Sequence, residues 1–520
     1  MGFVSRYPLA LILLLGLGLR LWRIDAALWY DEAFSAWLAR LPLTSLVEAA
    51  LGDVHPPLYY LILAGVTWPG HSEAALRLPS LLAGLGLIWL VYRLALALGQ
   101  SRNTALVAAL LCAISPFQVY YSQEARPYAL VMLAYTAAVL GMVERRTWLL
   151  VAGSVLALYL NNMSVVFVGC LFACAGYVTI GEGCRHPSLK MTIAAERQNL
   201  VWLIRAGGLI GLAYAPGAAM AWQQAANVGA GYWIPAPGLG RIVATLDDLL
   251  FFMPSSPLVI SGLITGLLII AILSDAPANL FLLSLVALPL ALVILISVTW
   301  QPILITRSMA ALGPLWLILV AGAVTRRRVT LGPAVAIIAI CGVVVPSLAP
   351  SVGRQPVDRA MISMYDHYQP GEAIYHANVG SYVVWVYYRP DTVQYLLPQQ
   401  TTIRETLSRE TRTAMGMRET DFKFIKCTLF VTGKGTYRPL HWWLIDYANP
   451  QAPPSERAGI EAILASYPAE KIAALKEDAF STAALYRIDP GCNPPPQPAS
   501  AAGRAKTTAH PPATRLQTPR

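Results

Sequence analysis

The fold of this chain is decided by the stretch Leu28-Trp29-Tyr30-Asp31-Glu32-Ala33-Phe34. It places two adjacent carboxylates directly after the first apolar segment, where a membrane helix would emerge into water. Two further polar clusters, Asp53-Val54-His55-Pro56-Pro57 and Gln123-Glu124-Ala125-Arg126-Pro127-Tyr128, also lie between apolar runs. We therefore expect the three clusters to face one compartment and to form one site.

The composition is typical of a membrane protein. Of the 520 residues, 56% are hydrophobic and 13% are charged, whereas soluble proteins carry about 25% charged residues. The length accommodates about ten membrane spans and one soluble domain. The net charge of +10 comes mostly from short loops between apolar runs and from the tail, as the positive-inside rule predicts. This distribution argues against nucleic acid as a partner.

Hydropathy predicts about eleven transmembrane helices. They are expected at residues 8–24, 78–98, 104–121, 128–143, 148–160, 165–180, 200–221, 257–273, 280–299, 309–324 and 331–348. The first is interpreted as an uncleaved span, since no small-residue cleavage site follows it. Residues 33–56 are expected to form short amphipathic helices on the membrane surface. Residues 57–68 are apolar but too short to span, which favours an interfacial or re-entrant segment.

Charge bias orients these spans. Arg102, Arg145 and Lys190 fall in loops on one side, and Asp31 and Glu124 fall on the other. Because basic loops are retained in the cytoplasm, we expect a cytoplasmic N-terminus and an extracytoplasmic C-terminal part.

Three regions follow from these patterns. Residues 1–349 are predicted to form an all-α polytopic membrane domain, with a first outer loop at 25–77. Residues 350–490 have soluble composition and alternate between helical and strand patterns, which indicates a small α/β domain. Strands are expected at 372–376, 427–432 and 483–488, helices at 357–368 and 455–466, and either type at 381–388. Residues 491–520 lack apolar periodicity, so disorder is expected there.

The polar clusters suggest a chemical role. Ionisable groups beside a bilayer are costly and are by default functional or paired. A carboxylate such as Asp31 at the mouth of a membrane cavity suits a general base, which takes a proton from an attacking hydroxyl. Arg126 and Arg307 suit a phosphate leaving group, because a guanidinium matches phosphate oxygens. The acidic clusters could also hold a divalent cation, for which the candidate ligands are Asp53, His55 and Glu124.

Each cluster also has a structural alternative. The carboxylates of Asp31 and Glu32 could cap a juxtamembrane helix, and His55 could be a solvated turn residue. Glu124 and Arg126 could form an interfacial ion pair between two spans. Tyr128 could belong to an aromatic belt at the membrane surface. The convergence of three clusters on one predicted face favours function.

Four motifs occur in a fixed order along the first part of the chain. They are Leu28-Trp29-Tyr30-Asp31-Glu32-Ala33-Phe34-Ser35, His55-Pro56-Pro57-Leu58-Tyr59-Tyr60, Arg77-Leu78-Pro79-Ser80, and Ser115-Pro116-Phe117 leading into Tyr121-Ser122-Gln123-Glu124-Ala125-Arg126-Pro127-Tyr128. This order resembles the bacterial membrane glycosyltransferases of the GT-C fold. These are related to dolichyl-phosphate-mannose–protein mannosyltransferases and to the lipid A aminoarabinose transferase. In the later spans, Thr306-Arg307-Ser308 resembles the family's Arg-Tyr element, with serine in place of tyrosine.

The resemblance implies a polyprenyl-phosphate sugar donor, a lipid, protein or polysaccharide acceptor, and inverting transfer on the extracytoplasmic face of a bacterial inner membrane. Asp31 matches the family's catalytic aspartate, and Glu32 its partner. His55, Glu124, Arg126, Tyr128 and Arg307 are implied to bind the donor phosphate or substrate. A divalent metal is the candidate cofactor, although Val54-His55 stands where the lipid A enzyme carries an acidic-basic pair.

Two other functions fit parts of the sequence. A transporter or flippase for polyprenyl-linked sugars would also contain intramembrane charges and broken helices, but such proteins usually show inverted repeats and midplane charges. A non-catalytic envelope polymer assembly protein would tolerate substitution of Asp31, Glu124 and Arg126 individually. The first alternative predicts uptake without a covalent product.

Overall fold

The structure, a computed structural model, describes most of the helical part of the chain and separate segments of the C-terminal part. The described residues are 7–53, 55–67, 72–183, 189–227, 234, 237–250, 276–326, 368, 372–376, 379–389, 392–396, 429–431, 437–439, 442–448, 461, 464–465, 469–476 and 482–488. The predicted spans 257–273 and 331–348, the helix 357–368 except for its last residue, most of 455–466, and the tail 491–520 lie outside them.

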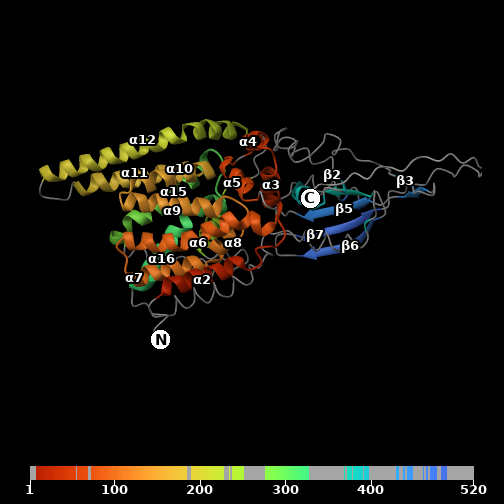
Figure 1. The fold of residues 1–520 in the computed structure, drawn as a ribbon, viewed down its shortest axis with the longest axis horizontal. Coiled ribbons are helices and arrows are strands. Elements are labelled where there is room, and N and C mark those ends of the chain that lie inside the picture. Colours follow the sequence, from red (N-terminus) through yellow and green to blue (C-terminus); the bar gives the residue numbers. More distant parts are fainter. Residues whose placement is uncertain are drawn as a thin grey trace, which may run out of the picture.

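Residues 7–326 are helical wherever the structure describes regular elements. The helices are α2 (Pro8–Leu21), α3 (Tyr30–Ala39), α4 (Leu43–Leu51), α5 (Leu58–Val66), α6 (Glu73–Ala97), α7 (Arg102–Ile114), α8 (Pro116–Ser122), α9 (Tyr128–Val143), α10 (Thr147–Leu160), α11 (Ser164–Gly183), α12 (Leu189–Asn227), α13 (Leu239–Leu250), α15 (Ala276–Thr299), the 3-10 helix η2 (Thr306–Leu312) and α16 (Gly313–Arg326). In Figure 1 the long helices lie side by side, and the strands lie beyond one end of the bundle, next to α3.

Several of these helices are long and apolar enough to cross a membrane. Within the described ranges, four meet this criterion, at Glu73–Ala97, Gln198–Ala225, Leu280–Thr299 and Thr306–Thr325, and α7 with α8 adds a fifth as a bent pair. The shorter apolar helices at Pro8–Leu21, Tyr128–Val143, Thr147–Leu160 and Ser164–Tyr177 coincide with predicted spans. The prediction of a polytopic all-α membrane domain is confirmed.

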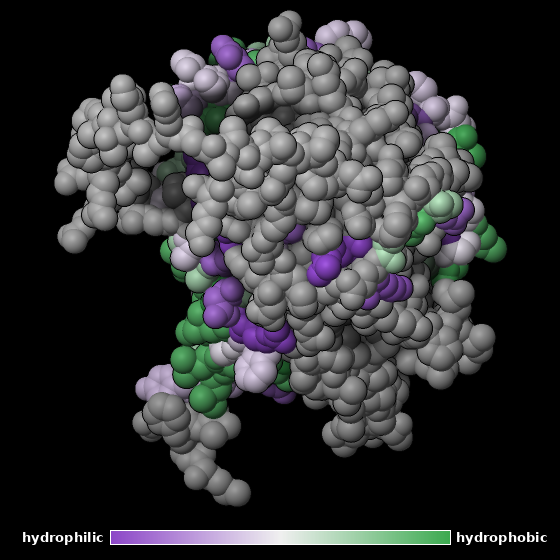
Figure 2. Space-filling model, turned by 90° about the vertical axis from the view of Figure 1, so that its right-hand side faces the viewer, coloured by the Kyte–Doolittle hydropathy of each residue, from purple (hydrophilic) through white to green (hydrophobic). Residues whose placement is uncertain are grey.

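The helix surfaces carry the large apolar side chains that a lipid-facing surface requires. Trp148, Leu212 and Trp300 are 67%, 76% and 84% exposed, and tryptophan is enriched at membrane–water interfaces. Figure 2 looks onto the end of the molecule that lies to the right in Figure 1, where hydrophilic residues are prominent among the described residues in view.

The predicted span 104–121 is broken into two helices. α7 ends at Ile114, α8 starts at Pro116, and the two axes differ by 56°. Proline cannot continue the hydrogen-bond ladder, and the hydroxyl of Ser115 accepts from the backbone N–H of Gln118 at 3.4 Å to cap α8. Hydropathy alone does not reveal this bend because both halves are apolar.

A buried arginine in α2 stabilises the bend. The Arg20 guanidinium donates to the carbonyls of Cys112 and Ala113 at 3.2 and 3.0 Å and to Ser122 Oγ at 3.1 Å. The last carbonyls of a helix lack intrahelical partners, so Arg20 satisfies acceptors that the break leaves open. A Cβ on Gly84 would overlap the Ser122 side chain, so a larger residue there would disturb this contact.

The loop at residues 25–77 forms three short helices, α3, α4 and α5, and the spacing of residues 33–56 predicts the short helices in the region of α3 and α4. α5 has 9 residues, too few to cross a bilayer of about 30 Å. Gln224 of α12 ties the loop to the bundle: its Nε2 donates to the carbonyls of Ala50 and His55, both at 2.9 Å.

The C-terminal part contains a five-stranded sheet in the order β2-β1-β5-β7-β6. The strands are β1 (Ala373–His376), β2 (Val393–Leu396), β5 (Trp442–Ala448), β6 (Ala469–Lys476) and β7 (Thr482–Ile488), while β3 (Leu429–Val431) and β4 (Tyr437–Pro439) form a separate pair. β1 pairs in parallel with β2 and β5, and β7 pairs antiparallel with β5 and β6. The predicted strands at 372–376, 427–432 and 483–488 are confirmed.

The ambiguous segment 381–388 is helical, as part of α19 (Val379–Tyr388). Because β1 and β2 are parallel neighbours, the chain between them must cross over, and a helix is the usual connection. The predicted α/β character is therefore confirmed for the described strands and α19.

Candidate active site

The candidate site forms where the N-terminal end of α3 meets the α8–α9 loop and η2. Asp31 lies in the first turn of α3, where the helix dipole favours an acidic group. Glu32 Oε2 accepts from the backbone N–H of Trp29 at 3.4 Å, which helps fix the start of the helix in the manner of a capping box. The sequence Trp29-Tyr30-Asp31-Glu32 thus specifies both the helix start and the position of its acidic pair.

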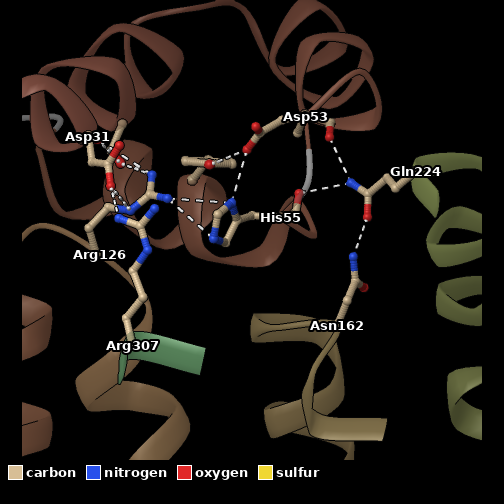
Figure 3. A network of polar contacts seen from close by, with 10 residues as sticks. Asp31, Asp53, His55, Arg126, Asn162, Gln224 and Arg307 are labelled. Atoms are coloured by element: carbon tan, nitrogen blue, oxygen red, sulfur yellow. Dashed lines mark hydrogen bonds and ion pairs between the residues drawn. The ribbon is translucent and has the colours of Figure 1, made fainter. Parts of the chain in front are cut away.

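Asp31 contacts two arginines from distant parts of the chain (Figure 3). Its Oδ2 is 2.8 Å from Arg307 Nη1 and 4.0 Å from Arg126 Nε. The Asp31 side chain is 13% exposed and that of Arg307 is 28% exposed, so both are accessible to a bound molecule. The structure therefore brings together three residues that the sequence singled out.

Arg126 is held by the backbone and by hydroxyls. Its Nη1 is 3.3 Å from Ser35 Oγ and 3.5 Å from the Asp31 carbonyl oxygen, and its own carbonyl accepts from Ser80 Oγ at 3.1 Å. Its side chain is 4% exposed. Nε has no hydrogen-bond partner among the described residues, since the Asp31 Oδ2 that it faces is 4.0 Å away.

His55 and Asp53 extend the polar network on the other side of Arg126 (Figure 3). Asp53 Oδ2 lies 3.3 Å from His55 Nδ1 and accepts from the Tyr60 hydroxyl at 2.8 Å. Arg126 Nη2 lies 3.2 Å from His55 Nε2. Since an arginine only donates, we assign the tautomer in which His55 Nδ1–H donates to Asp53 and Nε2 accepts from Arg126.

The electrostatics agree with this assignment. Burial first, and the charge of Arg126 second, lower the pKa of His55, against the opposing effect of Asp53. Burial alone would raise the pKa of Asp53, but the hydrogen bond from His55, the charges of His55 and Arg126 and the hydrogen bond from Tyr60 lower it to about 2. At neutral pH, His55 is therefore a neutral acceptor held beside an ionised Asp53.

Glu32 does not face the same space as Asp31. Both of its oxygens pair with Arg77, at 2.8 Å to Nε and 2.7 Å to Nη2, and Oε1 also accepts from the backbone N–H of Ala125 at 2.8 Å. Both side chains of the pair are fully buried. Glu32 thus joins α3, α6 and the α8–α9 loop, which makes it a positioning residue for Asp31 and Arg126.

Arg77, the partner of Glu32, also binds backbone carbonyls. Its Nη1 donates to the carbonyls of Ile24 and Ala26, at 2.7 and 2.5 Å, and Nη2 donates to that of Ala27 at 3.2 Å. These carbonyls lie in the segment between α2 and α3, which has no backbone ladder of its own. Arg77 of α6 therefore holds the segment that leads into Asp31 and Glu32.

Glu124 is buried beside the two other acidic residues. It is 2% exposed, and its Oε2 has no hydrogen-bond partner among the described residues. Burial, followed by the charges of Glu32 and Asp31, raises the pKa of its carboxyl to about 8. No Glu124–Arg126 ion pair occurs in this region of described side chains, and Arg126 pairs with Asp31 instead.

The other predicted residues have supporting positions. Tyr128 is buried at the start of α9 and packs edge-to-face on Tyr121 at 5.1 Å between ring centroids. η2, which carries Arg307, is tied to α13 because Thr306 Oγ1 donates to Asp248 Oδ2 at 2.6 Å. Asp248 is thus a structural partner of the site.

The candidate metal ligands do not gather in one place. Within the described residues, no group of three or more His, Cys, Asp or Glu side chains could hold a metal ion. Asp53 and His55 bond to each other, and the nearest charged partner of His55 is the cation Arg126, which would repel a metal. The described residues therefore do not fit a site built from Asp53, His55 and Glu124.

Sequence reasoning missed several residues that shape this site. Arg77 could have been found from the sequence, because it is an arginine at one end of an apolar run and belongs to the motif Arg77-Leu78-Pro79-Ser80. Ser35 and Tyr60 likewise lay inside quoted motifs. Gln224 carried no signal, because a single amide near a predicted helix end does not reveal what it contacts.

Comparison with known proteins bears on this architecture. Residues 54–194 match the family model of dolichyl-phosphate-mannose-protein mannosyltransferase, and no curated protein matches the chain by sequence. Among solved structures, ArnT from Cupriavidus metallidurans bound to undecaprenyl phosphate aligns with a TM-score of 0.52 and 12% identity over 93% of this chain and 98% of that chain. Its apo state gives 0.52 and 13% over the same shares.

A third similar structure is the archaeal oligosaccharyltransferase AglB from Archaeoglobus fulgidus in complex with an inhibitory peptide and a dolichol-phosphate. It aligns with a TM-score of 0.43 and 12% identity over 76% of this chain and 65% of that chain. The fold assignment rests on ArnT, whose length is covered almost completely. This multi-pass membrane protein therefore has the GT-C glycosyltransferase fold, and its residues 54–194 carry the sequence pattern of the dolichyl-phosphate-mannose-protein mannosyltransferases.

Proposed function

We propose that this protein is an inverting membrane glycosyltransferase, which moves a sugar from a polyprenyl-phosphate donor to an acceptor hydroxyl on the extracytoplasmic face of a bacterial inner membrane. The observation that carries the proposal is the convergence of Asp31 with Arg307 at 2.8 Å and Arg126 at 4.0 Å. One carboxylate and two guanidinium groups are the charges that this reaction requires.

The carboxylate serves the acceptor. Asp31 accepts the proton of the acceptor hydroxyl while that oxygen bonds to the anomeric carbon. The bond between this carbon and the phosphate oxygen breaks at the same time on the opposite face of the sugar, so the configuration inverts. The electron pair leaves with the polyprenyl phosphate, which gains one negative charge.

The two arginines serve the leaving group. Preorganised cations stabilise charge that develops in a transition state, and the buried Nε of Arg126 makes no hydrogen bond to any described residue. Arg307 is paired with Asp31. A phosphate that draws Arg307 toward itself would free Asp31 to accept the proton, so that donor binding prepares the base.

Two findings support the nature of the donor. The similar structure of ArnT is bound to undecaprenyl phosphate, and the matching family is described by a dolichyl-phosphate-linked sugar. The exposed apolar side chains of the helices would let the prenyl chain stay in the bilayer while its phosphate reaches the arginines. His55 and Glu124, which flank Arg126 and Asp31, would line the donor site with Tyr128.

The test uses purified protein in lipid with a panel of radiolabelled polyprenyl-phosphate sugars. We expect the wild type to release label from one donor and Asp31→Asn to release none while keeping its expression level and melting temperature. Parallel reactions with a chelator test whether a divalent cation contributes. Equal donor consumption by both proteins would contradict the role of Asp31. Donor translocation without a covalent product would favour transport instead.

A further inference from the structure

The C-terminal domain contacts both ends of the helix that carries Asp31. Two adjacent tyrosines at the end of α19 make these contacts. The Tyr388 hydroxyl accepts from the backbone N–H of Leu28 at 2.9 Å, just before α3 begins. The Tyr387 ring packs against the Arg40 guanidinium, 4.1 Å from ring centroid to Cζ, where α3 ends.

Tyr388 also reaches the bundle. Its hydroxyl donates to Glu73 Oε1 at 2.8 Å, in the first turn of α6. Glu73 lies one turn before Arg77, which pairs with the buried Glu32. A single hydroxyl therefore connects the segment before α3 to the helix that supplies the buried cation, and it uses its donor and acceptor capacity at once.

α19 is itself fixed to the sheet. His376 of β1 is fully buried, with Nδ1 3.1 Å from Ser381 Oγ in α19 and Nε2 3.0 Å from Gln394 Oε1 in β2. Because the glutamine oxygen only accepts, Nε2 is the protonated nitrogen, and Nδ1 accepts from Ser381. The contact of α19 with α3 is therefore made by an element that β1 and β2 hold in place.

We infer that Tyr388 is a positioning residue for Asp31, so that the C-terminal domain takes part in placing the catalytic carboxylate. This inference rests on the role of Asp31 in the proposed function. Tyr388 contacts Leu28, three positions before Asp31, whereas Arg126 and Arg307 are carried by other elements, the α8–α9 loop and η2. Loss of its hydroxyl should therefore displace the base relative to the phosphate-binding arginines without removing them.

The change Tyr388→Phe keeps the ring and removes both hydrogen bonds. It leaves the buried N–H of Leu28 without its acceptor, which is costly. A shift on the order of 1 Å in a catalytic group can reduce turnover by about a hundredfold, so we expect kcat to fall by about ten- to a hundredfold. The KM for the donor should stay near the wild-type value, because the arginines remain.

The matched control is Tyr159→Phe. The Tyr159 hydroxyl also bridges two helices, donating to the carbonyl of Ala213 at 3.0 Å, but it lies outside the candidate site. A second variant, Glu73→Ala, removes only one of the two partners of Tyr388. We expect a smaller decrease in kcat for Glu73→Ala than for Tyr388→Phe, and wild-type kcat for Tyr159→Phe.

The experiment measures kcat and donor KM for the full-length proteins in lipid, normalised to donor-binding sites, together with hydrogen exchange of the peptide containing Leu28. Faster exchange in this peptide and a selective fall in kcat for Tyr388→Phe are expected. Equal kcat for Tyr388→Phe and Tyr159→Phe would overturn this inference alone. A wild type that consumes no donor would overturn the proposed function and, with it, this inference.

Discussion

The substitution Glu124→Gln gives a quantitative test of the electrostatics of the site. Glu124 is 2% exposed, and burial, followed by the charges of Glu32 and Asp31, raises the pKa of its carboxyl from 4.5 to about 8. Below pH 8 the folded protein therefore holds this carboxyl in its protonated form. Glutamine has a similar shape and is neutral at every pH, so it mimics the protonated form without titrating.

The sign of the effect follows from proton linkage. Between pH 4.5 and about 8 the unfolded chain loses the Glu124 proton while the folded protein retains it, so the free energy of unfolding falls as pH rises. The fall is about 1.4 kcal/mol per pH unit and about 5 kcal/mol over the whole interval. Above pH 8 both states are ionised and the contribution no longer changes. Glu124→Gln removes this dependence.

The assay compares melting temperatures of wild type and Glu124→Gln in detergent between pH 5 and pH 9. We expect the variant to gain on the wild type by on the order of 5 to 10 °C as pH rises from 5 to 8. Glu48→Gln, at an exposed position of α4, is the matched control. Above pH 8 the ionised Glu124 should also raise the donor KM of the wild type. A melting-temperature difference that is constant with pH would refute the reasoning.

Two further pairs of substitutions test the buried and the accessible arginines. Glu32→Gln leaves Arg77 buried without its counter-charge and should lower the free energy of unfolding by about 3 to 5 kcal/mol. The control Glu144→Gln weakens the more exposed pairs of Glu144 with Arg93 and Arg146 and should cost about 1 kcal/mol or less. Equal melting temperatures for the two variants would contradict this. Arg307→Ala should reduce kcat by a factor of about 10² to 10³, and Arg307→Lys should reduce it by less. If Arg307→Ala matches the wild type in single-turnover kinetics, Arg307 has no role in stabilising the leaving group.

The helical part of the fold was predictable from the sequence, because the length and hydropathy of an apolar run indicate a membrane span. It failed at the α7–α8 bend, where the decisive contacts come from Arg20, a residue about a hundred positions away. In the C-terminal part, β1, β3 and β7 were predicted, but β2, β4, β5 and β6 were not. Strand pairing is a long-range property, and β5 acquires its place from a parallel contact with β1 and an antiparallel one with β7.

The candidate site was predictable to the extent that its charges lay in motifs. Asp31, Arg126 and Arg307 were named from residue chemistry and resemblance, and the structure places both arginines within 4.0 Å of the Asp31 carboxylate. The partition of roles was not predictable. Glu32 adjoins Asp31 in the sequence, yet successive helical residues point about 100° apart, so one carboxylate enters the site and the other is buried against Arg77.

The buried ionisable groups at this end of the bundle fall into two sets that hydrogen bonding distinguishes. Arg20, Arg77 and Glu32 meet backbone carbonyls, an N–H group or each other, so the cost of burying them is offset inside the protein. Arg126 Nε and Glu124 Oε2 are equally buried but have no hydrogen-bond partner among the described residues.

An unsatisfied buried polar atom costs about 1 to 3 kcal/mol, and more when it is charged. A protein can keep such atoms when a ligand satisfies them. The buried groups that have hydrogen-bond partners therefore hold the backbone in place. The groups with atoms that lack such partners among the described residues lie around Asp31, where the donor phosphate and sugar are proposed to bind. On this reasoning, a bound polyprenyl phosphate should stabilise the wild type against thermal unfolding more than it stabilises Arg126→Lys, because lysine lacks the Nε–H donor that has no hydrogen-bond partner among the described residues.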